Sequence, residues 1–160
     1  YSVSNKNFEL RILCSEKKWK LDEKYYYFAK LCAPLLHKEV PKFLVECDIL
    51  VIPRLKNMVN ELSFPSKLME YLAMGKPVIA SKTSDCHRII HHGVDGLLYD
   101  PGDKKDFIKK LELLWDSDYR KEIGENALKK VSNFTWSKQV DIIMYNIKNI
   151  CQNRTGKKIL

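Results

Sequence analysis

The sequence has no run of apolar residues near the roughly 20 that a membrane-spanning helix needs. Its first residues, YSVSNKNFEL, lack the layout of a signal peptide, and the chain does not begin with methionine. Its 160 residues are 45% hydrophobic and 30% charged, which is typical of a globular domain with its own core. We therefore expect one folded domain, cut from a longer protein.

Motifs for metal binding, redox chemistry and serine hydrolysis are also lacking. No C-x-x-C pair and no G-x-S-x-G occurs, and His91 and His92 are neighbours, so they cannot easily chelate one metal ion together. We expect no metal site. Five widely spaced cysteines predict small buried residues in a reducing, cytoplasmic compartment: Cys14, Cys32, Cys47, Cys86 and Cys151.

Positive charge is present in excess, at a net +8, but it is not concentrated. The lysines come as scattered pairs, and no zinc-finger, RNP or basic-zipper pattern accompanies them, so we expect no nucleic-acid partner. A solvated basic surface is the ordinary explanation. Peripheral attraction to an anionic membrane, at its inner face, remains an alternative.

Predicted strands and helices alternate along the chain. Apolar runs predict strands over 8–14, 48–53, 77–81 and 96–100. Helical spacing or capping residues predict helices over 21–33, from Pro41, over 65–74, within 85–93, and over 103–117, 119–131 and 136–151, with a polar loop over 54–63. This alternation predicts an α/β fold, a Rossmann-like parallel sheet with helices on both faces. Such sheets bind ligands at the carboxyl ends of their strands.

The helix predicted over 65–74 carries the candidate site. Its first turn contains Pro65, which suits the first helical position, and Lys67. A helix N-terminus offers unpaired N–H groups and about half a positive charge, which favours phosphate. Glu70 follows Ser66 by four residues, about 6 Å along the same face, where it would accept hydrogen bonds from a ribose diol. Alternatively, Glu70 is a solvated residue paired with Lys67.

Three segments then identify a family: FPSKLMEYLAMGKPVIAS, RIIHHGVDGLLYDPGD and RKEIGENALKKVSNFTW. In this order they resemble the C-terminal domain of glycosyltransferase family 4, retaining enzymes of the GT-B type with two Rossmann-like halves. The resemblance covers about residues 8–150, and ECDILVIPR resembles the strand before the first segment. It implies a nucleotide-sugar (donor) domain over residues 1–152, lacking its first strand and helix, and a frayed tail over 153–160.

The resemblance also assigns roles to residues. The family binds its donor with two glutamates separated by seven residues. Glu70 matches the second glutamate, which would hold the ribose. The first glutamate falls on Leu62, which is not acidic. Either Glu61, one position earlier, takes its place, or this protein does without that contact. The helix tip would meet the diphosphate. Apart from the resemblance, Arg54 follows the strand predicted over 48–53 and would either face the cleft or be an ordinary surface arginine. The tip consists of Phe64, Pro65, Ser66 and Lys67. No catalytic residue is identified.

The function implied is transfer of a sugar from a nucleoside-diphosphate sugar to a glycan or lipid-linked acceptor, in cell-surface polysaccharide synthesis, with no metal cofactor. The partner implied is the missing N-terminal half. The last helix, whose start resembles residues 134–136 (FTW), would pack on that half. Without that half we expect no turnover. A nucleotide-sugar-binding module without transferase activity, or a nucleotide-sugar epimerase of related architecture, remains an alternative.

Overall fold

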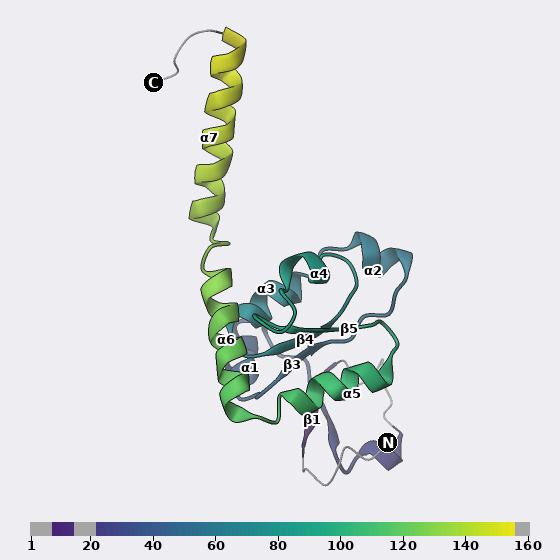
Figure 1. Cartoon of the computed structure of the whole chain (residues 1–160). Coiled ribbons are helices and arrows are strands. Elements are labelled where there is room, and N and C mark those ends of the chain that lie inside the picture. The colour runs from purple at the N-terminus through teal and green to yellow at the C-terminus, as the bar shows by residue number, and fades with distance from the viewer. Residues whose placement is uncertain (1–7, 15–21, 156–160) are drawn as a thin grey trace. The chain divides into compact units, whose positions relative to one another are not determined.

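The structure is a computed structural model that describes residues 8–14 and 22–155. The chain divides into two compact units, Tyr1–Cys47 and Asp48–Leu160. Within the described residues, every strand pairs with its neighbour in parallel, and helices separate most of the strands (Figure 1). The predicted α/β class with parallel strands is therefore confirmed.

The first unit contains a two-stranded parallel sheet of β1 (Leu10–Leu13) and β2 (Ala29–Cys32). A short 3-10 helix, η1 (Glu23–Tyr25), precedes β2. A second one, η2 (His37–Glu39), leads into α1 (Val40–Val45), which has Pro41 in its first turn as predicted.

The helix predicted over 21–33 is wrong. Asp22 caps only the single turn of η1, where its side chain accepts the N–H of Lys24. From Ala29 the chain is extended, and the carbonyl of Phe28, just before the strand, accepts the Leu10 N–H at 2.7 Å. Pairing with the distant strand β1 therefore outweighs the local helical spacing.

The second unit contains a three-stranded parallel sheet in the order β3-β4-β5. Its strands are β3 (Leu50–Ile52), β4 (Val78–Ser81) and β5 (Leu97–Tyr99), with Ile52 opposite Ala80 and Ala80 opposite Leu98. All four residues of β4 are buried, as expected of a central strand covered on both faces. The apolar runs that predicted these three strands are confirmed.

Helices cover both faces of this sheet, with α5 on one side and α3 and α4 on the other (Figure 1). The helices of this unit are α2 (Met58–Leu62), α3 (Ser66–Ala73), α4 (Cys86–Ile89), α5 (Lys104–Leu113), α6 (Ser117–Val131) and α7 (Trp136–Thr155). The loop predicted over 54–63 contains α2, because the Asn57 side chain accepts the Asn60 N–H and starts a short helix. The predicted tail, 153–160, is helical to Thr155; residues 156–160 lie outside the described part.

The core of this unit lies under β4 and β5. Five buried side chains form one cluster of it: Ile79, Leu97, Tyr99, Leu114 and Ile123. Phe107 and Leu111 of α5 pack against them, as the apolar spacing of the helix predicts. The packing fixes the sheet, whose strand ends border the candidate site.

Helices α3 and α6 approach closely because two glycines meet between them. Gly75 ends α3 with a φ of +63°, a left-handed conformation that favours glycine. A Cβ placed on Gly124 of α6 would lie 2.2 Å from the Gly75 carbonyl oxygen. The contact therefore requires glycine at position 124.

A buried ion pair ties α6 to the loop after α4. Lys130 Nζ lies 2.7 Å from Asp95 Oδ2 and also donates to the Ile89 carbonyl. The other oxygen of Asp95 accepts the His91 N–H at 2.8 Å. The side chains of Lys130 and Asp95 are 16% and 5% exposed. Each of the two charges is therefore neutralised by its partner at a site with little exposure to water.

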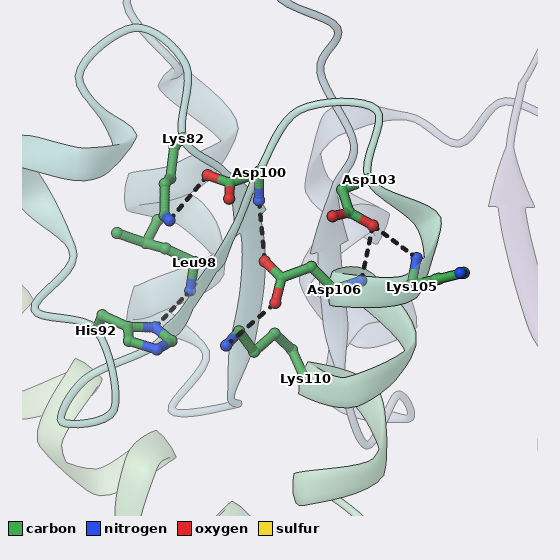
Figure 2. Close-up of polar contacts among 8 residues, drawn as sticks. All are labelled: Lys82, His92, Leu98, Asp100, Asp103, Lys105, Asp106 and Lys110. Atoms are coloured by element: carbon green, nitrogen blue, oxygen red, sulfur yellow. Dashed lines mark hydrogen bonds and ion pairs between the residues drawn. The ribbon is translucent and has the colours of Figure 1, made fainter.

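The corner between β5 and α5 is held by polar contacts (Figure 2). Asp103 caps α5 by accepting the N–H groups of Lys105 and Asp106 at 2.9 and 3.0 Å. Asp106 accepts the Asp100 N–H at 3.1 Å and pairs with Lys110. These contacts orient α5 against the sheet.

In the same corner, His92 Nδ1 accepts the Leu98 N–H at 2.9 Å (Figure 2). Burial lowers the pKa of His92, and the positive charges of Lys110 and Lys82 lower it further, against a smaller opposing effect of Asp106. The folded state therefore favours neutral His92. The contribution of His92 to the free energy of unfolding is fully present above its unfolded pKa of about 6.5. It is lost as the pH falls through the lower pKa of the folded state.

We expect His92→Asn to reduce the pH dependence of stability below about pH 6.5. The Asn side-chain oxygen still accepts the Leu98 N–H but does not titrate. Thermal melts between about pH 7.5 and 5 measure the difference, with His87→Asn, at an exposed histidine, as the control. An equal loss of Tm with falling pH in wild type and His92→Asn would contradict this account.

Candidate functional site

The carboxyl ends of β3 and β4 lie side by side and are joined by Ser81, a buried residue. Its Oγ accepts the Arg54 N–H at 3.0 Å and lies 3.2 Å from Thr83 Oγ1. Polar groups therefore gather where parallel sheets place ligands.

A pocket of about 220 Å³ opens next to the end of β3. It lies between this strand end and the beginning of α3, and its lining residues are Val51, Ile52, Pro53, Arg54, Ser66, Lys67 and Tyr71. Three residues predicted from the sequence, Arg54, Ser66 and Lys67, thus meet in one pocket. Two of them carry positive charge.

The first turn of α3 begins at this pocket. Pro65 is the buried N-cap residue, and no side chain caps the helix. The first turn of an α-helix carries partial positive charge, which adds to the charges of Arg54 and Lys67. Two of its N–H groups, those of Ser66 and Leu68, donate to the carbonyls of Phe64 and Pro65. The arrangement is suited to an anion such as a phosphate.

Glu70 lies one turn further along α3 and is exposed, but it does not line the pocket. Leu68 and Leu72 of the same helix are fully buried. Tyr71 lines the pocket although the sequence analysis did not identify it. It follows Lys67 by four residues, the same spacing that identified Glu70, and could have been found in that way.

The other predicted residues, Glu61 and Phe64, do not line the pocket, nor does Leu62. Leu62 is 80% exposed and Phe64 is 56% exposed. Glu61, at the end of α2, accepts the Ser84 N–H through Oε2 at 3.3 Å. The guanidinium of Arg54 donates to the carbonyl and the Oγ of Ser63, at 3.3 and 3.0 Å. Glu61 and Arg54 therefore both hold neighbouring backbone in place.

No disulfide joins any of the five cysteines, all of which lie in the described residues. Cys86 is buried and the other four are partly exposed, so the prediction of small buried cysteines holds for Cys86 and is wrong for the other four. Burial raises the pKa of the Cys86 thiol, with a smaller opposing effect of Arg54. In the described ranges, no cluster of three or more His, Cys, Asp or Glu could bind a metal ion. None of the helices described is both long and apolar enough to cross a membrane.

Comparison with known proteins gives consistent results. The family model described as Glycosyl transferases group 1 matches residues 3–117. An uncharacterized glycosyltransferase from Methanocaldococcus jannaschii is 33% identical over 103 residues, which cover 64% of this chain and 28% of that protein. The chain therefore spans less than a third of the length of this relative.

Two solved structures are similar in fold. The C-terminal domain of a group 1 glycosyl transferase from Francisella tularensis is 25% identical, with a TM-score of 0.58, over 69% of this chain and 55% of that one. HepE from Anabaena, solved with UDP and glucose, is 20% identical, with a TM-score of 0.63, over 77% of this chain and 33% of that one.

Proposed function

Since the chain belongs to the glycosyl transferases group 1 family, we propose that it is the donor-binding half of a retaining glycosyltransferase. The enzyme would move a sugar from a nucleoside-diphosphate sugar to a glycan or lipid-linked acceptor. One observation carries the proposal: the pocket beside β3 combines the first turn of α3 with the side chains of Arg54 and Lys67. This is a site for the diphosphate of the donor.

In this proposal, the Lys67 side chain and the partial positive charge of the first turn of α3 attract the diphosphate, with Phe64, Pro65 and Ser66 forming the edge of the site. Glu70, one turn further on, accepts hydrogen bonds from the ribose diol. As the bond to the sugar breaks, negative charge grows on the departing diphosphate. Fixed positive charges and N–H groups stabilise it there without a metal ion.

The missing N-terminal half would cover α7. Five apolar side chains recur along α7 every three or four residues and are all about half exposed or more: Trp136, Val140, Ile143, Ile147 and Ile150. Such a stripe is the face that a helix buries against a partner. The acceptor would bind largely to that half, so the chain alone would bind donor without transferring sugar.

We expect the chain to bind one nucleoside diphosphate selectively. Titration calorimetry with UDP, GDP, ADP and their monophosphates measures this, beginning with UDP because HepE was solved with it. Loss of a charge-assisted hydrogen bond in Lys67→Ala should weaken binding about tenfold, and Glu70→Ala should weaken it comparably. Lys121→Ala, at an exposed lysine of α6, is the matched control and should bind as wild type does.

Two results would contradict the proposal. One is that no diphosphate binds to the chain. The other is that a diphosphate binds with equal affinity to wild type, Lys67→Ala and Glu70→Ala, which would place the nucleotide elsewhere.

A further inference from the structure

Side-chain contacts join the turn after β4 to the end of α2 and to Ser63, the residue that follows α2. Ser84 Oγ donates to the Ser63 carbonyl, and Glu61 Oε2 accepts the Ser84 N–H at 3.3 Å. Ser63 is also held from the other side by Arg54, whose guanidinium donates to its carbonyl and hydroxyl oxygens. Contacts therefore run from the turn after β4 to the residues that lead into α3.

Ser84 has an uncommon backbone conformation. Its φ is +52°, and it is the single non-glycine residue with positive φ among the described residues. Left-handed backbone costs a residue with a Cβ about 1 kcal/mol or more and persists where surrounding contacts hold it. Ser84 is 6% exposed, so its N–H needs a partner within the protein. Glu61 provides that partner.

The same contacts determine where α3 begins. Ser63 precedes Phe64, whose carbonyl accepts the Ser66 N–H at 3.0 Å, and Pro65, whose carbonyl accepts the Leu68 N–H at 2.8 Å. Displacement of Ser63 would therefore displace the first turn of α3, including Ser66 and Lys67 in the pocket. A site loses affinity when its binding groups are held loosely.

We propose that Glu61 is a positioning residue for the diphosphate site: by accepting the Ser84 N–H, it holds the turn after β4 and, through Ser63, the first turn of α3. Its carboxylate then acts on the protein's own backbone and not on the nucleotide. The proposal rests on the proposed function and assigns to Glu61 a role other than direct contact with the donor.

Substitution of Glu61 and Ser84, singly and together, tests the proposal. Glu61→Ala should weaken binding of the selected nucleoside diphosphate about fivefold to tenfold, because a first turn of α3 that is held loosely binds the ligand less well. Glu61→Gln should bind within about twofold of wild type, because its amide oxygen still accepts the Ser84 N–H. Ser84→Gly keeps positive φ without strain, but it removes the hydroxyl that donates to the Ser63 carbonyl and so breaks the path from Glu61 to Ser63. The additional effect of Glu61→Ala in that background should therefore fall below about twofold.

Glu70→Ala provides the comparison for a residue that contacts the nucleotide, since its effect should be the same in the wild-type background and in the Ser84→Gly background. An equal effect of Glu61→Ala in both backgrounds, or loss of binding in Glu61→Gln, would overturn the positioning role. It would mean that the Glu61 carboxylate touches the ligand itself.

A second readout needs no nucleotide. Amide hydrogen exchange of Ser84 should be faster in Glu61→Ala and unchanged in Glu61→Gln, with Glu112→Ala, at an exposed glutamate of α5, as the control. Unchanged exchange in Glu61→Ala would overturn the proposal even if nucleotide binds. If wild type binds no diphosphate, the proposed function fails, and the exchange measurement still decides whether Glu61 holds the turn.

Discussion

Gly124→Ala should destabilise the protein by about 3 kcal/mol or more. Alanine is the better helix former by about 1 kcal/mol, but its Cβ would lie 2.2 Å from the Gly75 carbonyl oxygen. The atom it meets belongs to the backbone and cannot rotate away. Helices α3 and α6 would therefore have to separate, which also disturbs the buried Leu72 and Ala127.

Urea denaturation measures this effect. The midpoint should fall while the slope m stays constant, which identifies a change of stability alone. Glu125→Ala, at the exposed neighbouring residue, should change the free energy of unfolding by no more than about 0.5 kcal/mol. A stability of Gly124→Ala equal to that of Glu125→Ala would show that α3 and α6 do not approach as described.

Lys130→Met should cost about 3–5 kcal/mol of stability. Methionine retains most of the apolar length of lysine, so the loss comes from Asp95. Its buried carboxylate keeps the His91 N–H and the exposed His91 imidazole at 3.5 Å but loses the charge of Lys130. Lys129→Met, at the exposed neighbouring lysine, should have an effect below about 0.5 kcal/mol.

The double variant Asp95→Asn/Lys130→Met separates charge from packing. Because it buries no unpaired charge, it should recover more than half of the loss seen in Lys130→Met. Denaturation of the four proteins gives the coupling energy. Additive effects of the two substitutions would contradict the buried pair.

The sequence identified those parts of the fold in which short-range pattern and environment agree. The run DILVIP predicted β3 because a central parallel strand is apolar on both faces. Pro65 predicted the start of α3 because its ring suits the first turn and its N–H is not needed there. Phe107 and Leu111 predicted the buried face of α5 by their spacing.

The sequence did not reveal contacts that depend on distant residues. The segment ending at Cys32 has helical spacing, and only its pairing with β1 makes it a strand. The contact from Glu61 to Ser84 spans 23 residues, and no local pattern encodes such a distance. The positive φ of Ser84 could not be predicted from the sequence, because glycine is the usual indicator of that conformation.

In the site, the sequence found residues by charge and helical position but could not distinguish their surroundings. Arg54, Ser66 and Lys67 meet in one pocket, as their places after a strand and at a helix start suggested. Glu61 was predicted as a donor ligand, a role that stays untested, while its contact with the Ser84 N–H could be recognised only once the turn after β4 was placed.

The most direct test of the central claim is an NMR titration of the isotope-labelled chain with the nucleoside diphosphate that it binds best. The account predicts that amide shifts concentrate at Arg54 and between Ser66 and Tyr71, and that the amides of α5 do not change. Shifts confined to α5 or to the first unit, or the absence of any shift with UDP, GDP and ADP, would contradict the claim that this pocket binds the donor.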